Sequence, residues 1–270
     1  MELESKYNKL KEILSKIEKP LLAFSGGVDS TFLAGVAAEL ELDLKAITIK
    51  SPFIPEDEIQ ESIELAKTLD IDHEIIEVDF DQFGRALNNS RERCYYCKKM
   101  IFSKIKEYAE AENRTVIEGT NQDDQGDYRP GMKALKELKI KSPLLEAGLK
   151  KSEIRNLSAK INLLTWDKPS LSCLATRVSY NSEITEEKLA RIEAAESYLI
   201  ELGFKQYRVR DHNNLARIEV LPEERKRLFD LEILDDLNNK IKDLGFDHVT
   251  LDLGGYQSGS MNQSLEVNNE

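Results

Sequence analysis

Residues 20–24 read PLLAF and residues 25–30 read SGGVDS, so a short apolar stretch leads directly into a glycine-rich turn. Adjacent glycines adopt positive φ without strain and let backbone N–H groups approach an anion closely. The two serines of the turn add hydroxyl donors, and a helix expected to begin near Thr31 would point its positive dipole end at the same place. The pattern predicts a pyrophosphate-binding turn between a strand and a helix.

The turn differs from the Walker phosphate loop. That loop has two glycines separated by four residues and then a Lys-Ser or Lys-Thr pair, whereas no lysine follows SGGVDS here. The alternative without a ligand is a turn whose aspartate and serine cap a helix. The strand before the turn and the helix after it favour a nucleotide loop of a different kind. Asp29, inside the turn, is the candidate ligand for magnesium or pyrophosphate.

The composition limits the class of protein. The chain has 270 residues, with 38 basic and 50 acidic side chains and a formal net charge of −12, which argues against non-specific nucleic-acid binding. No apolar run approaches the roughly 20 residues of a membrane span, and the amphipathic N-terminus lacks a signal-peptide core. Three cysteines are too few for a secreted disulfide framework. We therefore expect a cytoplasmic protein whose cysteines have a chemical role.

Strand-like and helix-like segments alternate over the first two thirds of the chain, which is typical of a parallel sheet with helices on both faces. Ligands of such α/β sheets bind at the carboxyl ends of the strands. We expect strands at residues 21–24, 44–49, 73–78 and 115–118, and helices at residues 31–40, 56–69, 97–112, 132–138 and 151–161.

The pattern changes after residue 180. A helix at residues 185–202 precedes two strands at 207–210 and 216–221, a helical stretch at 222–244 and a last strand at 248–253. This α-β-β-α-β order predicts a small α+β domain with its own sheet. We place a boundary near residue 181. The first domain, residues 1–180, would bind the nucleotide and carry the cysteines, and the second, residues 181–270, would bind substrate or form oligomers.

Gly119 and Asn121 lie where the fourth expected strand leads into an acidic loop at residues 122–131. Active-site segments of α/β enzymes occupy this position. Carboxylates there would hold Mg²⁺ beside nucleotide phosphates, since this ion prefers one or two carboxylates with phosphate oxygens and water. A solvated turn is the alternative. The predicted nucleotide and magnesium contacts are Ser25, Gly26, Gly27, Asp29, Ser30, Gly119 and Asn121.

The cysteines are Cys94, Cys97 and Cys173. Cys94 and Cys97 lie three apart at an expected helix start, where both thiols can bind one metal, and Cys173 supplies a third thiol. Structural zinc normally has four protein ligands, whereas three thiolates can hold a 4Fe-4S cluster and leave one iron open to an exogenous sulfur. A redox disulfide, a zinc site and buried structural cysteines are the alternatives.

Two groups of arginines accompany these features. Arg93 and Arg177 flank the cysteines, where they would lower thiol pKa values or bind an anionic substrate. Arg208 and Arg210 lie two apart in an expected strand and so share one face, and Arg217 follows in the next strand. A phosphate-bearing substrate suits this pair. Surface ion pairs with the many glutamates are the alternative.

Together these segments resemble the LarE-type sulfur transferases of the PP-loop ATP pyrophosphatase superfamily, which mature the nickel-pincer nucleotide cofactor of lactate racemase. SGGVDS is common to the superfamily, whereas the combination of DYRPG, RVR and LDLGG is much narrower. The resemblance spans nearly the full length and rests on SGGVDS at 25, YYCKKM at 95, GDYRPGMKA at 126, the Cys173 segment, RVRDHNNLARIE at 208 and LDLGG at 251.

The resemblance implies an activity. Such an enzyme uses ATP and Mg²⁺ to adenylate a carboxylate of pyridinium-3,5-biscarboxylic acid mononucleotide, releases pyrophosphate, and replaces AMP with sulfur to give a thiocarboxylate. One subtype sacrifices the sulfur of the cysteine equivalent to Cys173, and another holds a 4Fe-4S cluster on three cysteines. Cys94, Cys97 and Cys173 place this chain with the second subtype. A PP-loop tRNA thiolase is the alternative.

The resemblance also implies further site residues and partners. Arg208 and Arg210 match the arginines that bind the substrate phosphate. Glu196 falls in the matching helix and Asp235 matches an acidic residue near the reaction centre, so these two join Cys173 as expected catalytic residues. A homo-hexamer built around the C-terminal domains and a downstream nickel insertase are the implied partners. The expected substrate contacts are Arg93, Arg177, Arg208 and Arg210.

Overall fold

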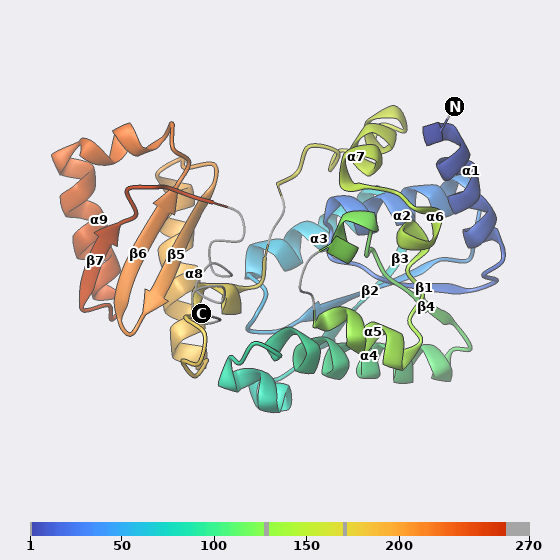
Figure 1. Ribbon diagram of the computed structural model, residues 1–270, viewed down its shortest axis with the longest axis horizontal. Coiled ribbons are helices and arrows are strands. Elements are labelled where there is room, and N and C mark those ends of the chain that lie inside the picture. The colour runs from blue at the N-terminus through green and yellow to red at the C-terminus, as the bar shows by residue number, and fades with distance from the viewer. Residues whose placement is uncertain (1, 127–129, 170–171, 258–270) are drawn as a thin grey trace. The chain divides into compact units, whose positions relative to one another are not determined.

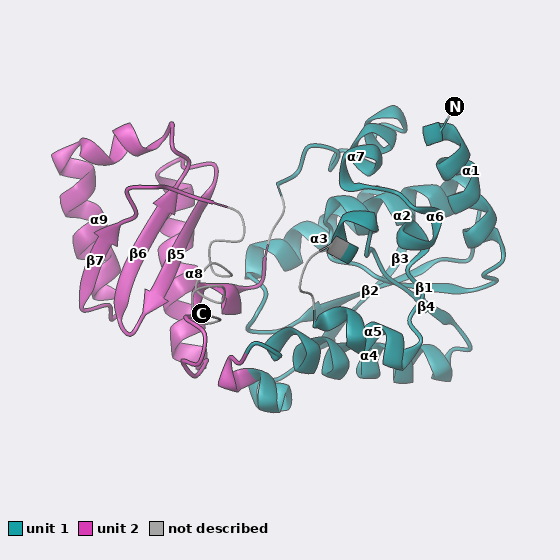
Figure 2. Ribbon diagram, viewed as in Figure 1, with its two compact units in different colours: residues 1–86, 91–171 teal, residues 87–90, 172–270 magenta. Residues whose placement is uncertain are grey.

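The computed structural model describes residues 2–126, 130–169 and 172–257, so the DYRPG segment and the C-terminal tail lie partly or wholly outside the described residues. The chain forms two compact units (Figure 2). Unit 1 comprises residues 1–86 and 91–171, and unit 2 comprises residues 87–90 and 172–270. The units change between residues 171 and 172, before the predicted boundary near residue 181. Cys173 therefore belongs to unit 2, while Cys94 and Cys97 belong to unit 1.

Unit 1 contains a parallel sheet with the strand order β3-β2-β1-β4 (Figure 1). All neighbouring strands are parallel, and Leu22 of β1 lies opposite Ala46 of β2 and Ile117 of β4. β2 is buried except for its half-buried last residue, as expected of a strand covered on both faces. The predicted α/β fold class is confirmed. The strands are β1 (Pro20–Ala23), β2 (Lys45–Lys50), β3 (Asp72–Glu77) and β4 (Thr115–Ile117).

Helices cover both faces of this sheet. Right-handed crossovers run from β1 to β2 to β3 in one direction, so α2 and α3 lie on one face, whereas the return to β4 places α4 and α5 on the other (Figure 1). None of the described helices combines the length and apolarity needed to cross a membrane. The helices and helical turns are α1 (Glu2–Ser15), α2 (Val28–Glu39), α3 (Glu56–Thr68), η1 (Phe80–Asn88), α4 (Arg93–Ala111), η2 (Gln122–Gly126), α5 (Gly131–Leu138), α6 (Pro143–Ala147) and α7 (Lys151–Lys160).

The core of unit 1 fixes α1 and α7 against α2. Leu10 of α1, Phe32 of α2 and Leu157 of α7 are buried in one apolar cluster with Leu22 of β1. Full burial of each such side chain contributes about 1.5–3 kcal/mol to stability. The first residue of α7 is thereby held close to the first turn of α2.

The sheet reverses its order at β1. β1 pairs with β2 on one side and with β4 on the other, so the chain leaves the carboxyl ends of β1 and β4 in opposite directions. Such a topological switch point is where open α/β sheets bind ligands. The SGGVDS turn follows β1 and Gly119 follows β4, so two of the predicted site segments meet at this point.

Unit 2 has a three-stranded sheet in the order β5-β6-β7, in which β5 and β6 are antiparallel and β6 and β7 are parallel. α8 packs on β5 and α9 packs on β7. The predicted helical stretch at 222–244 is divided, because the Asp230 carboxylate caps a new helix by accepting a hydrogen bond from Glu232 N at 2.9 Å. The elements are η3 (Leu174–Arg177), α8 (Glu186–Glu201), β5 (Tyr207–His212), β6 (Leu215–Val220), η4 (Arg225–Phe229), α9 (Leu231–Asp243) and β7 (His248–Leu251).

Candidate active site

The turn between β1 and α2 has the backbone geometry of an anion site. Gly26 has φ +64°, a left-handed conformation that favours glycine, and a Cβ there would lie 3.2 Å from a neighbouring backbone atom. Gly27 is the N-cap of α2, which begins at Val28 and thus earlier than predicted. Asp29 and Ser30 consequently lie in the first helical turn, at the positive end of the helix dipole.

Hydrogen bonds between its own residues fix the shape of this turn. The hydroxyl oxygens of Ser25 and Ser30 lie 3.3 Å apart, and Ser30 Oγ donates to the carbonyl oxygen of Gly27 at 3.2 Å. The backbone N–H of Gly27 donates to Ser25 Oγ at 3.4 Å. The two predicted hydroxyl donors therefore meet across the turn.

Gly119 lies against the turn at the end of β4. A Cβ at this position would lie 3.0 Å from Asp29 Cβ and 3.3 Å from Ser30 N, so only glycine lets the two segments approach this closely. Asn121, which is buried, accepts a hydrogen bond from Asp123 N at 3.0 Å through its side-chain oxygen. Gly119 thus contacts the phosphate turn, while Asn121 stabilises the following loop.

A lysine that no sequence pattern identified reaches Asp29. Lys151, the first residue of α7, places Nζ 2.5 Å from Asp29 Oδ2. The other carboxylate oxygen, Oδ1, is buried and has no hydrogen-bond partner among the described residues. Burial raises the pKa of the Asp29 carboxyl above its ordinary value, and the Lys151 charge opposes this shift. A carboxylate oxygen without a hydrogen-bond donor fits the predicted magnesium ligand.

A second distant lysine supports the glycine of the turn. Lys168 Nζ donates to the carbonyl oxygen of Gly26 at 3.0 Å and pairs with Glu61 at 2.9 Å. Arg155 of α7 anchors this segment by donating to the carbonyl oxygens of Trp166 and Lys168 at 2.8 and 2.6 Å. The two lysines lie 122 and 142 residues after their partners in the turn, so no local pattern predicts them.

Cys94 and Cys97 lie in the first turn of α4, three residues apart, and therefore on the same side of the helix. The Arg93 guanidinium, which is buried, lies 4.0 Å from Cys94 Sγ. All three cysteines are in the described part of the chain, and none forms a disulfide. Two thiols in one helical turn fit two ligands of a cluster. Across the described ranges, no three His, Cys, Asp or Glu side chains gather into a metal-binding group.

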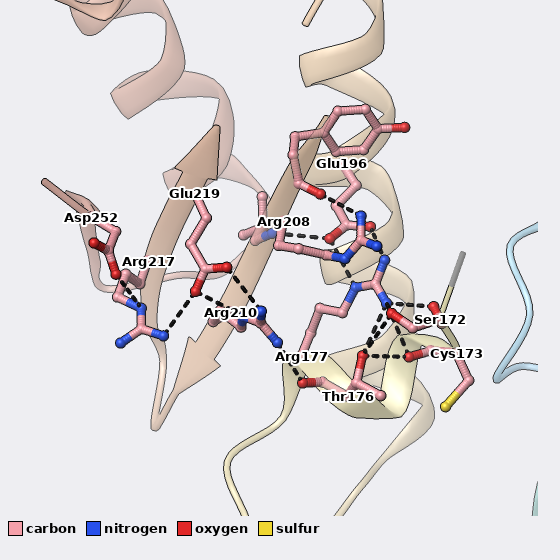
Figure 3. A network of polar contacts seen from close by, with 12 residues as sticks. Ser172, Cys173, Thr176, Arg177, Glu196, Arg208, Arg210, Arg217, Glu219 and Asp252 are labelled. Atoms are coloured by element: carbon pink, nitrogen blue, oxygen red, sulfur yellow. Dashed lines mark hydrogen bonds and ion pairs between the residues drawn. The ribbon is translucent and has the colours of Figure 1, made fainter. Parts of the chain in front are cut away.

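Arg177 connects the backbone at Cys173 to the interior of unit 2 (Figure 3). Its Nε and Nη2 donate to the Glu196 carboxylate at 3.0 and 2.9 Å. Its Nη1 donates to the carbonyl oxygens of Ser172 at 2.5 Å and Cys173 at 3.1 Å. Glu196 also accepts from Val209 N at 2.9 Å. The guanidinium nitrogens of Arg177 therefore donate to Glu196 and to backbone carbonyls, and these bonds hold the Cys173 loop in position.

Arg210 is engaged in a buried ion pair. Its Nε and Nη2 donate to the two oxygens of Glu219 at 2.9 and 2.8 Å, and its Nη1 donates to the Thr176 carbonyl at 3.0 Å. Arg217 adds a further bond to Glu219 at 2.9 Å (Figure 3). The two guanidinium groups thus surround a carboxylate that is 1% exposed.

Arg208 differs from its neighbours because it is buried and no carboxylate pairs with it among the described residues. Its Nη1 donates to the carbonyl oxygen of Tyr207 at 2.6 Å, and its guanidinium lies 5.2 Å from the centre of the Tyr256 ring. Burial lowers the pKa of Arg208, and the charge of Arg177 lowers it further. A buried cation without a carboxylate is stabilised by an added anion, so Arg208 fits a bound phosphate.

Asp235 lies apart from this network. It is exposed on α9, and the polar contacts drawn in Figure 3 among the described residues do not include it. Within unit 2, the structure brings together Cys173, Glu196 and the arginines of β5. No contact in this network supports the predicted catalytic role of Asp235, which stays a prediction.

Comparison of the sequence with known proteins identifies the family of this chain. Residues 18–102, which include the turn after β1, match the asparagine synthase family. A protein of Lactiplantibacillus plantarum named pyridinium-3,5-bisthiocarboxylic acid mononucleotide synthase is 35% identical over 268 residues, covering 97% of this chain and 96% of that protein. This chain belongs to the LarE-type family. The family uses the PP-loop fold, and the turn at the switch point is that of an ATP-utilising enzyme.

Two other relatives match over nearly their whole length. An uncharacterised protein of Synechocystis sp. is 41% identical over 265 residues, covering 97% of this chain and 99% of that protein. An uncharacterised protein of Methanocaldococcus jannaschii is 35% identical over 252 residues, covering 93% and 95%. The likeness to the LarE-type family thus includes both units, as the sequence motifs predict.

Proposed function

We propose that this chain is an ATP-dependent sulfur transferase that forms AMP and pyrophosphate. It would adenylate the carboxylates of pyridinium-3,5-biscarboxylic acid mononucleotide and convert them to thiocarboxylates, a step of nickel-pincer cofactor biosynthesis. The observation that carries this proposal is the 35% identity to the L. plantarum synthase over 97% of the chain, which includes the SGGVDS turn. Reduced thiols suit the cytoplasm, where we place the reaction.

Adenylation would take place at the turn of unit 1. A carboxylate oxygen is a poor leaving group until it becomes part of a phosphate ester. The substrate carboxylate therefore attacks the α-phosphorus of ATP, the bond to the bridging oxygen breaks, and pyrophosphate leaves with the electron pair. Ser25, Ser30 and the backbone of Gly26 and Gly27 would donate to that pyrophosphate. Asp29 would hold Mg²⁺, which neutralises phosphate charge.

Arg208 would bind the phosphate of the mononucleotide. It is buried, and among the residues described no carboxylate forms an ion pair with it, since Glu196 acts on it only at longer range, so a phosphate dianion would provide the direct ionic contact that it lacks. Planar guanidinium donors match phosphate oxygens in bidentate geometry. Arg210, already paired with Glu219 at 2.8 Å, would support the site at longer range.

The sulfur step would use the cysteines. Cys94, Cys97 and Cys173 are the proposed ligands of a 4Fe-4S cluster, which when bound would present sulfide to the acyl-adenylate from an open iron position. The spacing of Cys94 and Cys97 in one turn of α4 supports this ligand set. Arg177 holds the Cys173 carbonyl at 3.1 Å, so the loop that carries this thiol is anchored. If sulfide is supplied in this way, each chain can catalyse many turnovers. If the sulfur of Cys173 itself is transferred, each chain can react only once.

Assembly into a homo-oligomer would use unit 2. Phe229, Leu231 and Leu253 are 70%, 74% and 74% exposed, and a shallow hollow beside them is lined by Phe229, Leu251 and Leu253. Exposed apolar side chains grouped in this way support an interface between copies of the chain. The thiolated product would then pass to a nickel insertase.

Anaerobic reconstitution tests this proposal. The purified chain is analysed for iron and acid-labile sulfide and then incubated with the biscarboxylic acid mononucleotide, ATP, Mg²⁺ and sulfide. We expect about four irons per chain, pyrophosphate release and more than one thiocarboxylate per chain by mass spectrometry. Zinc in place of iron would reject the cluster, and conversion of Cys173 to dehydroalanine would assign the sulfur to that residue. Absence of pyrophosphate release would reject the proposed activity.

The variants Cys94→Ala and Cys97→Ala provide the matched control. Both positions lie in α4, outside the SGGVDS turn, so the variants should release pyrophosphate at the wild-type rate in the first turnover. Release should then stop, because the acyl-adenylate is not consumed without sulfur transfer. The variants should lose iron and all thiocarboxylate formation. Full sulfur transfer without iron would contradict the cluster assignment.

A further inference from the structure

Lys151 places an ammonium group at the nucleotide turn. Its Nζ lies 2.5 Å from Asp29 Oδ2, and its backbone N–H donates to Asp123 Oδ2 at 2.9 Å, so both the side chain and the helix start are fixed. The Lys151 and Asp29 side chains are 28% and 22% exposed, which leaves the pair accessible to a ligand. The packing of α7 on α2 brings this lysine to the switch point of the sheet.

We propose that Lys151 is a catalytic residue of the adenylation step, whose ammonium group binds the β- and γ-phosphates of ATP and neutralises pyrophosphate as it leaves. The inference rests on the proposed ATP-dependent function. Lys151 contributes charge and hydrogen bonds to the breaking bond and transfers no atom.

Of the cations described at this turn, Lys151 can most readily exchange its bond to Asp29 for a bond to a phosphate. Lys168 is held by the Gly26 carbonyl at 3.0 Å and by Glu61 at 2.9 Å, and Arg155 donates to two backbone carbonyls. In the part of the chain that the structure describes, the Lys151 ammonium group forms its hydrogen bond and ion pair with the Asp29 carboxylate alone. The flexible four-carbon stem of a lysine lets the ammonium group swing to a nearby anion.

Asp29 provides the reason for this exchange. Its Oδ1 is buried and unpartnered among the described residues, whereas its Oδ2 is occupied by Lys151. Mg²⁺ held by Asp29 would neutralise the carboxylate and weaken its attraction for Lys151. The phosphates of bound ATP would bring new negative charge to the same turn. Lys151 thus supplies from α7 the cation that a Walker loop carries within its own sequence.

The experiment measures the affinity of the full-length chain for inorganic pyrophosphate and for AMP by titration calorimetry in the presence of Mg²⁺. Lys151→Gln retains a hydrogen-bond donor to Asp29 but removes the charge, and Lys151→Arg restores the charge. Lys150→Gln is the matched control, because Lys150 is the neighbouring lysine and is exposed. Thermal unfolding of each variant reports whether the fold is kept.

We expect Lys151→Gln to weaken pyrophosphate binding by about tenfold or more, since charge-assisted hydrogen bonds are the stronger class. AMP affinity should change by less than about twofold, because AMP lacks the β- and γ-phosphates. Lys151→Arg should recover most of the loss, and Lys150→Gln should match the wild type. Unchanged pyrophosphate affinity in Lys151→Gln, or an equal loss of AMP affinity, would overturn the assignment.

A footprint on the wild-type chain tests the contact without a substitution. Acetylation of Lys151 and Lys150 is compared by peptide mass spectrometry with and without Mg²⁺-pyrophosphate. We expect pyrophosphate to protect Lys151 and to leave Lys150 unchanged; equal labelling of Lys151 in both conditions contradicts the inference. A wild-type chain that binds neither AMP nor pyrophosphate would reject the proposed function as well, which separates the two failures.

Discussion

Arg177 and Glu196 form a bidentate ion pair in the interior of unit 2, with side-chain exposures of 3% and 7%. The third nitrogen of the guanidinium donates to the carbonyl oxygens of Ser172 and Cys173 (Figure 3). The pair therefore links the position of a predicted reactive thiol to a buried carboxylate on α8. Loss of either partner should therefore affect stability and the proposed sulfur transfer together.

Glu196→Ala should destabilise the protein by about 3–5 kcal/mol, because it leaves the Arg177 charge buried without its carboxylate. Thiocarboxylate formation should fall more than the first-turnover burst of pyrophosphate, since the Cys173 loop lies in unit 2 and the ATP turn in unit 1. Urea unfolding and the two product assays provide the measurements. Glu201→Ala, at the exposed end of α8, should change stability by no more than about 0.5 kcal/mol.

Glu196→Gln sharpens this test. Glutamine retains one acceptor for Arg177 but removes the charge, so the stability loss should be smaller than in Glu196→Ala. A Glu196→Ala variant in which thiocarboxylate formation and the first-turnover burst of pyrophosphate decline in parallel would argue that Glu196 has only a structural role.

Arg208→Met should raise the KM for the mononucleotide without lowering the stability of the chain. The buried guanidinium has no carboxylate partner in the described residues, so an apolar side chain of similar length removes a desolvation cost. The loss of a charge-assisted contact corresponds to a KM increase of about tenfold or more. Steady-state kinetics measure the KM, and thermal unfolding measures the stability.

The nucleoside form of the substrate, which lacks the phosphate, tests whether Arg208 binds that phosphate. Wild type and Arg208→Met should use it equally poorly, because in the proposed site Arg208 binds the phosphate of the substrate and no other part of it. Lys205→Met, which removes an exposed cation just before β5, should leave the KM unchanged. An unaltered KM for the mononucleotide in Arg208→Met would place the phosphate elsewhere.

The sheet of unit 1 and the turn after β1 were predictable because their local patterns agree with the packing, whereas the break within the helical stretch 222–244 was not predicted. The strands of unit 1 begin and end within one residue of the positions expected from apolar runs between turn residues. Gly26 has the positive φ that the turn requires, and Gly119 takes part in the same site. Those properties belong to short segments, and a short segment is what a sequence pattern describes.

The charged contacts of the site were not predictable in the same way. Lys151 and Lys168 reach the turn through the tertiary packing of α7 and the segment that follows it, 122 and 142 residues from their partners. Arg177 was expected to bind substrate, but its contacts with Glu196 and the Cys173 backbone depend on how η3 meets α8. A sequence pattern gives the residue type, while the partner follows from the fold.

The protein should lose stability as the pH falls from 7.5 to 5.5. Burial lowers the pKa of His73 and of His212 below the ordinary value of 6.5. The unfolded chain therefore binds more protons than the native chain as the pH drops through about 6.5, and stability falls. Each histidine contributes less than about 1.4 kcal/mol of this loss by pH 5.5, because both side chains are only half-buried and solvent screens the effect. Urea unfolding at several pH values measures it.

His73→Gln isolates one contribution. The His73 Nε2 lies 2.8 Å from Thr48 Oγ1, whose own proton goes to the Phe24 carbonyl, so glutamine can replace the imidazole donor without titrating. The pH dependence of stability should become shallower than in the wild type. His248→Gln, at an exposed strand position, serves as the control. A His73→Gln variant with the wild-type pH dependence would show that this histidine is not the titrating group.

Phe229→Glu and Leu231→Glu should reduce the size of the proposed homo-oligomer in solution. Both side chains are at least 70% exposed, and Leu234 lies one turn beyond Leu231 on the same side of α9. Burial of each such side chain between copies would contribute about 1.5–3 kcal/mol, and a carboxylate there carries a desolvation cost instead. Light scattering after size-exclusion chromatography gives the mass.

Leu164→Glu is the matched control for this test, because Leu164 is 76% exposed but belongs to unit 1. If unit 2 forms the interface, Leu164→Glu retains the wild-type mass while the two unit 2 variants become smaller. The reverse result would move the interface to unit 1. A wild-type chain that is monomeric at all concentrations would leave the apolar side chains of unit 2 without a partner copy and reject the homo-oligomer.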